Sequence, residues 1–365
     1  MTDYAKRLSA LTAALRDRGL SAAVIAPSDH MRYLIGWSEP GYERLIALVI
    51  CTDGGAALVV PPVNADSAGA AAGALVQMRV WQDADGWEAA LGGLLPSEGV
   101  VAVDDELGAG HLLRMQALAP RLRWAPGEQV LAELRSRKSP QEIERMEGSG
   151  ALADAVCAQV LASLARGLRE EELYASIGER YHRAGADDFM ALVCFGANAA
   201  SPHHRSDGTA LADGDVVVLD TGARLAGYWS DITRTVAFGA PDPEARRVYD
   251  LVYRAHRAGF AAVRPGATGE DVDRAAREVI EAAGYGDRFT HRTGHGLGLS
   301  VHEPPYLVGG SREPLREGSC VTVEPGVYLP GRFGVRVEAA VTVTASGARY
   351  LNVEPPAELE VVEVR

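Results

Sequence analysis

Four carboxylates and one imidazole stand out because each lies in glycine-rich or strand-like sequence. They are two aspartates eleven residues apart, one histidine between two glycines, and two glutamates in β-rich segments: Asp220, Asp231, His295, Glu324 and Glu338. Several carboxylate oxygens with a single imidazole suit a hard or borderline divalent cation. Two adjacent cations of this kind are a known device for hydrolysis. The sequence therefore predicts a two-metal hydrolase.

The two aspartates are expected on neighbouring arms of a hairpin. On its own, Asp220-Thr221-Gly222 is typical of a turn after a strand. Gly222 and Gly227 lie between the aspartates and favour a chain reversal that sets Asp231 beside Asp220. One bridging and one terminal carboxylate would then be available to a pair of cations.

The other three candidates also lie where the backbone is constrained. Glycines flank His295 on both sides, and glycines allow close approach of the backbone. Glu324 precedes a Pro-Gly pair, so it is expected in an extended conformation before a turn. Arg336 and Glu338 alternate with valines, which predicts that they share one face of a strand. Taken alone, such a pair is typical of a surface ion pair.

His203 and His302 are candidates for roles other than metal binding. An imidazole can donate a hydrogen bond to the oxyanion of a tetrahedral intermediate, or hold a substrate carboxylate. Other catalytic patterns do not fit this sequence. It has no H-E-x-x-H zinc pattern, no G-x-S-x-G nucleophile elbow and no P-loop, and Leu299 interrupts what would be a dinucleotide fingerprint.

Length and composition indicate a globular protein of two domains. The chain has 365 residues, of which 47% are apolar and 23% charged. Its net charge of −13 argues against nucleic acid and anionic membrane as partners. The N-terminus predicts an amphipathic helix rather than a signal peptide, and no apolar run reaches the ~20 residues of a membrane span. With four widely spaced cysteines, these features predict a cytoplasmic protein with free thiols.

Strands and helices are expected to alternate over the first part of the chain. Periodicity predicts one helix marked by Leu8, Leu11 and Leu15, strands over 22–26, 45–50, 56–60 and 99–103, and helices over 65–75 and 87–95. This pattern predicts an α/β domain over residues 1–132. Ser139-Pro140-Gln141-Glu142 then has the form of a capping box that opens a long helix. Residues 133–365 are expected to form the second domain.

The second domain repeats itself in sequence. Gly167 with Gly266, Gly185 with Gly284 and His203 with His302 recur after 99 residues, and Asp220 with Glu324 and Gly227 with Gly331 after 104. The period is too long for a solenoid. It predicts two copies of a unit of helices and antiparallel strands, related by a pseudo-two-fold axis. Such symmetry would bring the carboxylates of the two copies face to face.

Residues 140–355 resemble the M24 metallopeptidase family, in its Xaa-Pro peptidase branch of prolidases and aminopeptidases P. The resemblance is specific because several motifs occur in the right order. They are Asn198-Ala199-Ala200-Ser201-Pro202-His203, Asp220-Thr221-Gly222, Gly227 to Thr235, Thr293 to Pro305, Glu324-Pro325-Gly326 and Gly334 to Glu338. Residues 1–130 resemble the N-terminal domain of that branch. The resemblance implies an α/β creatinase-like N-terminal domain and an α+β pita-bread catalytic domain with a pseudo-two-fold internal repeat.

The resemblance also implies roles for individual residues. The family's dinuclear ligands match Asp220, Asp231, His295, Glu324 and Glu338. Of these, Asp231 and Glu338 would bridge both metals. The histidines that stabilise the substrate match His203 and His302. Arg336 matches an arginine that holds the substrate or the site.

Two further expectations concern the chemistry of this site. Glu324 is expected to carry a proton to the leaving proline nitrogen. Ala339 follows Glu338 where the family usually has Asp, so the support of that ligand is expected to differ here. The site would hold two divalent ions, with Mn²⁺ expected first and Co²⁺ or Zn²⁺ as alternatives.

The activity implied by the resemblance is cleavage of a peptide bond that precedes proline, in a small peptide with proline at its second position. A dipeptidase is expected first, with an aminopeptidase P acting on longer peptides as the alternative. Trp37 and Tyr42 are candidates for a wall that closes the cleft. Arg336 and the histidines are candidates for meeting a substrate carboxylate, together with residues from the N-terminal domain of a partner subunit. Some relatives have lost the metals and act as amidinohydrolases or binding scaffolds, but this chain keeps all five ligands. A homodimer is also implied.

Overall fold

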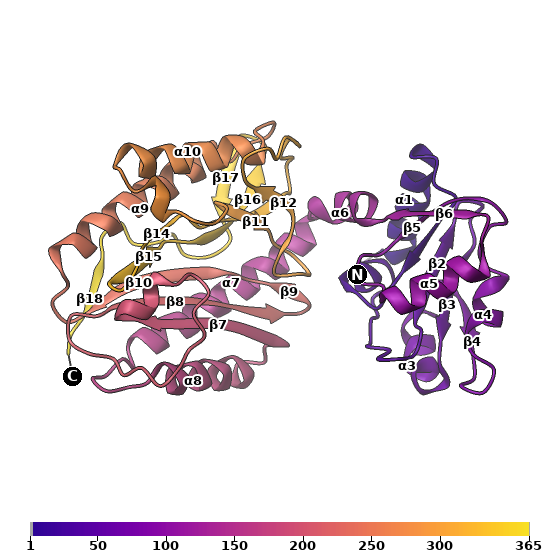
Figure 1. Cartoon of the computed structure of the whole chain (residues 1–365), viewed down its shortest axis with the longest axis horizontal. Helices are drawn as coiled ribbons and strands as arrows, with labels where there is room; N and C mark the ends of the chain where they lie inside the picture. Colours follow the sequence, from indigo (N-terminus) through magenta and orange to yellow (C-terminus); the bar gives the residue numbers. More distant parts are fainter. Residues whose placement is uncertain (1–2, 365) are drawn as a thin grey trace. The chain divides into compact units, whose positions relative to one another are not determined.

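The computed structural model describes residues 3–364. The chain divides into two compact units, Met1–Arg135 and Ser136–Arg365 (Figure 1). Helix α6 (Glu128–Ser136) spans this division, and the domain boundary predicted after residue 132 falls inside the same helix. Each unit has hydrophobic cores of its own.

Unit 1 contains one mixed sheet of six strands in the order β4-β3-β2-β1-β5-β6. Strand β1 pairs antiparallel with β2 and parallel with β5. The strands are β1 (Ala22–Ile25), β2 (Ala47–Cys51), β3 (Ala56–Val60), β4 (Gln77–Val80), β5 (Gly99–Val103) and β6 (Leu122–Pro126). The central strands are buried on both faces, which explains their continuous apolar runs.

Five further helices complete unit 1. They are α1 (Tyr4–Asp17), α2 (Asp29–Ile35), α3 (Pro62–Ala72), α4 (Glu88–Gly92) and α5 (Ala109–Leu118). Helix α1 buries Leu8, Leu11 and Leu15 against the sheet, as the spacing predicts. Gly19 adopts φ +65° just beyond the helix, the conformation expected of a glycine that ends a helix.

Unit 2 is an α+β unit in which four long helices cover curved, mainly antiparallel sheets (Figure 1); the pair β10–β18 is parallel. The helices are α7 (Pro140–Leu161), α8 (Glu170–Arg183), α9 (Pro243–Ala262) and α10 (Gly269–Ala282). The first sheet runs in the order β18-β10-β8-β7, with β9 paired to β8; the second runs β12-β11-β13-β16-β17, and β14 pairs with β15.

The strands of unit 2 are short except for three strands of the first sheet, which have 8, 10 and 7 residues. They are β7 (Asp188–Phe195), β8 (Val216–Leu225), β9 (Tyr228–Trp229), β10 (Ile232–Phe238), β11 (Gly294–Gly296), β12 (Glu303–Leu307), β13 (Cys320–Val323), β14 (Gly326–Leu329), β15 (Phe333–Arg336), β16 (Ala339–Thr344), β17 (Gly347–Tyr350) and β18 (Glu360–Val362). Helices α7 and α8 share an apolar core with β7, β8 and β10.

Helix α7 begins as predicted. The Ser139 side chain accepts from the Glu142 N–H and the Glu142 side chain accepts from the Ser139 N–H, so the capping box is complete. Two glycines inside α7 do not end it. Gly150 is required by packing, because an added Cβ would lie 2.3 Å from the carbonyl oxygen of Leu351.

The internal repeat predicted from the sequence is present in the backbone. Glycines at matching positions share the left-handed conformation: φ is +82° at Gly167 and +83° at Gly266, +82° at Gly185 and Gly284, +90° at Gly214 and +86° at Gly318, and +84° at Gly227 and +73° at Gly331. The helix pair α7–α8 of the first copy corresponds to α9–α10 of the second. The two copies therefore share turn geometry as well as sequence.

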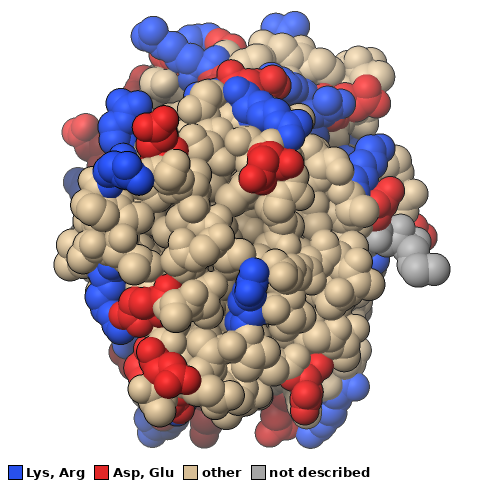
Figure 2. Space-filling model, turned by 90° about the vertical axis from the view of Figure 1, so that its right-hand side faces the viewer, with Lys and Arg blue, Asp and Glu red and all other residues tan. Residues whose placement is uncertain are grey.

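The surface carries both signs of charge. On the face drawn in Figure 2, acidic and basic side chains lie interspersed toward the edges, while uncharged side chains fill most of the middle. Within residues 3–364, no helix combines the length and apolar character that crossing a bilayer requires.

Candidate metal centre

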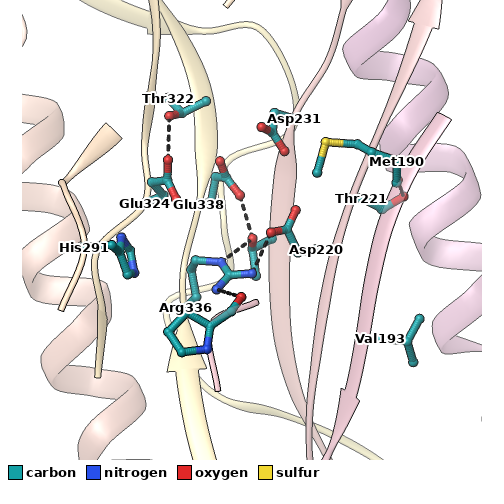
Figure 3. A network of polar contacts seen from close by, with 12 residues as sticks. Met190, Val193, Asp220, Thr221, Asp231, His291, Thr322, Glu324, Arg336 and Glu338 are labelled. Carbon is teal, nitrogen blue, oxygen red and sulfur yellow. Dashed lines mark hydrogen bonds and ion pairs between the residues drawn. The ribbon is translucent and has the colours of Figure 1, made fainter. Parts of the chain in front are cut away.

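The five predicted ligands converge in unit 2. Ligand atoms of Asp220, Asp231 and Glu338 lie within 4.8 Å of one another, and those of His295, Glu324 and Glu338 form a second such group. Glu338 belongs to both groups. His295 Nε2, from the second group, also lies 3.7 Å from Asp231 Oδ2 of the first, so the two groups are neighbours. Figure 3 shows the four carboxylates around one space.

Strand junctions place most of these side chains. Asp231 lies between β9 and β10, Glu324 between β13 and β14, and Glu338 between β15 and β16. His295 is the middle residue of β11. Asp220 differs from the expectation of a strand end, because β8 continues five residues beyond it to Leu225. Its pairing with β10 sets Asp220 opposite Thr233 and so brings it beside Asp231.

Close backbone contacts explain the glycines around these ligands. An added Cβ on Gly222 would lie 2.0 Å from the carbonyl oxygen of Ser230, which is the close approach that brings the two aspartate segments together. Next to His295, an added Cβ on Gly294 would lie 2.0 Å from the carbonyl oxygen of Thr322. Neighbouring strands therefore press directly against the ligand-bearing backbone.

The chemistry of the site fits a pair of cations. Asp220 Oδ1 and Asp231 Oδ1 are buried and have no hydrogen-bond partner within residues 3–364. An unpartnered carboxylate oxygen in the interior is costly, and a cation satisfies it. His295 Nδ1 lies 3.0 Å from the Gly296 carbonyl oxygen, to which it can only donate. Nε2 then presents its lone pair toward Glu324, 3.2 Å away, which is the orientation of a metal ligand.

Arg336 is buried beneath the carboxylates, and all its described contacts are within the protein. Its Nη2 donates to Asp220 Oδ2 (2.5 Å) and its Nε to Thr233 Oγ1 (3.0 Å). Its Nη1 donates to Tyr328 Oη (2.9 Å) and to the Pro202 carbonyl oxygen (3.4 Å). These contacts turn most of the guanidinium toward the protein and hold Arg336 against Asp220. Its expected contact with a substrate carboxylate stays a prediction.

The predicted histidines lie beside this centre. The ring of His302 packs edge-on against that of His295, with 4.1 Å between centroids. Partial burial and the adjacent His295 lower the pKa of His302 to about 4, so its ring is neutral at pH 7. His203 is exposed on the loop after β7, and burial lowers the pKa of His291. His291 Nε2 contacts Tyr328 Oη at 2.8 Å.

Comparison with known proteins identifies the family. Residues 144–345 match the model of metallopeptidase family M24, and residues 7–137 match the creatinase/prolidase N-terminal domain. This chain belongs to metallopeptidase family M24. It is therefore a metal-dependent hydrolase, and the predicted family and fold class are confirmed.

Solved structures and curated relatives of this M24 chain match it along its length. Dipeptidase PepE from Mycobacterium ulcerans is 40% identical with a TM-score of 0.94, covering 99% of this chain and 98% of that one. A prolidase from Thermococcus sibiricus is 31% identical with a TM-score of 0.94, covering 99% and 100%. The Xaa-Pro dipeptidase of Lactobacillus helveticus is 30% identical over 359 residues, covering 96% and 97%.

Two threonines that sequence reasoning missed support the M24 carboxylates. Thr233 Oγ1 donates to Glu338 Oε2 (2.5 Å), and Thr322 Oγ1 donates to Glu324 Oε1 (3.0 Å). Ala339, the departure from the family pattern, is buried at the start of β16 and has no polar side chain to offer Glu338. Strand alternation could have found Thr322, because it lies two residues before its carboxylate.

The segment that carries His302 is held by a buried ion pair. Lys138 Nζ lies 2.6 Å from Glu303 Oε1, with side-chain exposures of 2% and 5%. The Lys138 N–H donates to the Gly318 carbonyl oxygen, so the lysine is tied to the second sheet by its backbone as well. The sequence shows Lys138 only as part of a polar connector, and nothing local signals its partner 165 residues away.

One predicted wall residue is not available for that role. Trp37 is buried in the core of unit 1, where it packs among the side chains of α1, α2 and the sheet. The interpretation of Trp37 as a pocket wall is therefore wrong. Tyr42 is 86% exposed with φ +53°, and its assignment stays a prediction.

Carboxylate repulsion makes the metal-free M24 site sensitive to pH. Burial and the nearby charges of Glu338 and Asp220 raise the pKa of Asp231 well above 3.8. Burial and the charges of Glu324 and Asp220 likewise raise the pKa of Glu338. Above about pH 4 the unfolded chain releases protons that the folded protein retains, so stability is lost as pH rises toward the folded pKa values. Thermal unfolding in chelator is expected to show a falling Tm from pH 5 to 8.

The matched variant for this pH series is Asp231→Asn, which removes one of the repelling charges and keeps the side-chain shape. Its metal-free Tm is expected to fall less steeply with pH than that of the parent, and to be higher at pH 8. Identical slopes in the two proteins would show that Asp231 does not titrate in this range.

Proposed function

We propose that this chain is an Xaa-Pro dipeptidase that uses two divalent metal ions. The observation that supports it is the convergence of two adjoining ligand groups that share Glu338, in a chain similar along its whole length to a dipeptidase and a prolidase. The proposed ligands are Asp220, Asp231, His295, Glu324 and Glu338. All five are present, which speaks against a metal-free amidinohydrolase or binding scaffold.

In the proposed site, the ions and the side chains have different roles. When bound, two cations supply Lewis acidity and lower the pKa of water toward neutral. Asp231 and Glu338 are proposed to bridge both ions, and Thr233 orients Glu338 by donating to its Oε2. Arg336, which also donates to Thr233, holds Asp220 by donating to its Oδ2. Each ligand is thus held before substrate arrives, which lowers the cost of assembling the charged site.

Proton transfer is assigned to Glu324. Thr322 and His295 both engage its Oε1, which holds the carboxylate in one orientation. Burial opposes ionisation of Glu324, but nearby polar and charged groups lower its pKa to about 2, so its side chain is a carboxylate at neutral pH. A carboxylate held in this way can pass a proton to the proline nitrogen as the peptide bond breaks.

The oxyanion of the tetrahedral intermediate needs hydrogen-bond donors, and His302 and His203 are proposed to supply them. A neutral His302 retains one N–H donor while its low pKa keeps it from adding charge beside the ions. His203 lies on the opposite copy of the repeat, which allows donors to approach from two sides. A bond to proline has no N–H, so these donors act on the carbonyl side.

A dipeptide presents a free carboxylate close to the scissile bond, and a dipeptidase needs a cation to meet it. Most of the Arg336 guanidinium is turned toward the protein. Arg292 is partly exposed, its guanidinium lies 4.4 Å from the ring centroid of Tyr306, and its charge reaches His302. We therefore assign Arg292 to the substrate carboxylate, which favours dipeptides over the longer substrates of an aminopeptidase.

Three further assignments belong to the same proposal. Mn²⁺ is proposed as the metal because carboxylate oxygens dominate the ligand set and leave only one imidazole, with Co²⁺ and Zn²⁺ as alternatives. The active form is proposed to be a homodimer in the cytoplasm. The four cysteines, all free, suit a reducing compartment.

The proposed function predicts rapid hydrolysis of Ala-Pro and slow hydrolysis of Ala-Pro-Ala by the Mn²⁺-loaded enzyme. Chelation is expected to abolish both activities, and added Mn²⁺ to restore them. Arg292→Gln is expected to reduce kcat/KM for the dipeptide by about 10-fold or more, since a hydrogen bond between charged groups is lost, and to change the tripeptide rate much less. Product analysis by chromatography measures each rate.

The outcomes of this assay separate the alternatives. Activity that is unaffected by chelator would reject metal catalysis. Cleavage of the tripeptide alone would reject the dipeptidase in favour of an aminopeptidase P. Equal losses on both substrates in the Arg292 variant would remove the assigned carboxylate contact.

A further inference from the structure

The loop that carries His203 is tied at both ends to the start of helix α8. It leaves β7 at Phe195 and returns to the helix near Asp207. At the returning end, the Glu170 N–H donates to the Thr209 carbonyl oxygen (3.1 Å) and the Glu171 N–H donates to the Asp207 carbonyl oxygen (3.0 Å). The first turn of α8 is therefore the anchor of this loop.

Glu170, the first residue of α8, reaches into the loop with a fully buried side chain. Its Oε1 accepts from the Phe195 N–H (2.7 Å) and the Asn198 side-chain amide (3.1 Å). Its Oε2 accepts from the Asp207 N–H (3.1 Å) and lies 2.9 Å from His204 Nε2. Because a carboxylate only accepts, the His204 nitrogen must donate. Four donors thus converge on one buried charge, and together they fix the start, middle and end of the loop.

Glu170, His204 and Asp207 are also close enough together to be considered as a cation site, since ligand atoms of all three lie within 4.8 Å. The hydrogen bonds argue against that reading. Both oxygens of Glu170 already face N–H donors, and Asp207 Oδ1 accepts from the Thr209 N–H (2.8 Å). Donor hydrogens in these positions repel a cation. The group is a hydrogen-bonded clamp.

The clamp acts on the immediate neighbours of His203. On one side, the Pro202 carbonyl oxygen accepts from Arg336, the same side chain that holds Asp220. On the other side, the His204 ring is held by Glu170. His203 itself remains exposed. The backbone on both sides of His203 is therefore held, while its imidazole is left free of these contacts.

The second copy of the repeat lacks this carboxylate. Gly269 occupies the matching position 99 residues after Glu170, and an added Cβ there would lie 2.2 Å from the carbonyl oxygen of Tyr306. Both helices nevertheless have a capped N-terminus, because the side chains of Glu172 in α8 and Asp271 in α10 each accept from the backbone N–H of their N-cap residue. Glu170 is thus not needed to start a helix.

We propose that Glu170 is a positioning residue for hydrolysis: by clamping the loop through His204, it holds His203 where its imidazole meets the substrate. This inference rests on the proposed function, in which His203 donates to the reacting carbonyl. It adds a residue 33 positions upstream, and the side-chain hydrogen bonds described for Glu170 all go to this loop.

The first test is Glu170→Gln in the Mn²⁺-loaded enzyme with Ala-Pro as substrate. The amide keeps the shape of the side chain but presents N–H groups to donors, so the loop should shift. A misplaced imidazole is expected to cost about 10- to 100-fold in kcat/KM, mainly in kcat, with metal content unchanged. Glu172→Gln is the matched control, since that exposed carboxylate lies on the same helix and only caps it. Parent-like activity of Glu170→Gln would overturn the proposal.

A double variant distinguishes positioning from general support of the fold. If Glu170 acts through His203, then Glu170→Gln should change kcat/KM less than about twofold once His203→Ala is already present. Losses that multiply in the double variant would overturn the proposal, because Glu170 would then act by another route.

A protease readout tests the clamp without activity. Arg205 is exposed within the loop, so trypsin cleavage after it, followed by mass spectrometry, reports opening of the loop. Cleavage there is expected to be at least about 10-fold faster in Glu170→Gln than in the parent or Glu172→Gln. His204→Ala removes one hydrogen-bond donor to Glu170 and leaves Glu170 itself unchanged. It is also expected to speed trypsin cleavage after Arg205, and it provides the test if Glu170→Gln fails to fold. Unchanged cleavage in the folded variants would overturn the clamp, whereas a parent inactive on Ala-Pro would reject the proposed function instead.

Discussion

Replacement of Asp231 by alanine is expected to remove bound metal and dipeptide hydrolysis together. Asp231 lies in one ligand group with Asp220 and Glu338, and its Oδ2 is 3.7 Å from His295 in the other. Loss of a shared ligand should therefore empty both positions. Metal catalysis supplies several kcal/mol of transition-state stabilisation, so kcat/KM on Ala-Pro should fall by about 10³-fold or more. Elemental analysis and a chromatographic assay measure the two effects.

The control for this variant must exclude loss of the fold. Asp250→Ala removes an exposed aspartate on α9 that pairs only with Arg254 among its described ionic contacts, and it should keep metal and activity. Metal-free Asp231→Ala is expected to unfold at a temperature no lower than the metal-free parent, because the change relieves buried repulsion. An active Asp231→Ala enzyme would remove Asp231 from the ligand set.

Lys138→Met is expected to destabilise the protein by about 3–5 kcal/mol, because it leaves the Glu303 carboxylate buried without its cation. The ion pair is enclosed, so solvent cannot replace the lost partner. Because Glu303 follows His302 directly, dipeptide hydrolysis should fall as well. Urea unfolding of the metal-loaded enzyme, followed by circular dichroism, measures the free energy of unfolding.

Two further variants make the Lys138 experiment specific. Arg183→Met breaks an exposed ion pair with Glu179 on α8 and should cost less than about 1 kcal/mol. Adding Glu303→Gln to Lys138→Met removes the stranded charge and should recover much of the lost stability. A Lys138→Met protein as stable as the parent would mean that Glu303 is protonated or solvated in that variant.

The ligand set could be predicted because its signals are local. Glycines around His295 and a hairpin between Asp220 and Asp231 are visible as short patterns, and the structure explains each by close backbone contact. The repeat could be predicted for the same reason: its left-handed turns demand glycine at matching positions. Strands β4 and β6 were missed since both lie at sheet edges and carry exposed polar residues.

Residues that support the ligands could not be predicted, because their partners lie far away in sequence. Glu303 is 165 residues from Lys138, and Glu338 is 105 residues from Thr233. Arg336 shows a different limit. A sequence does not reveal burial. In the structure Arg336 is buried and has four hydrogen-bond partners, one of which is Asp220.

Joining the two copies in one polypeptide has a consequence for how the site can diverge. In a site formed by two identical subunits, every mutation would occur in both halves, so the residues on both sides of the site would always change together. Here each copy has its own codons, and matching positions differ: residue 170 of the first copy is glutamate and residue 269 of the second is glycine. A single polypeptide therefore allows the segments that flank the site to differ between the two copies, while both copies keep their ligands.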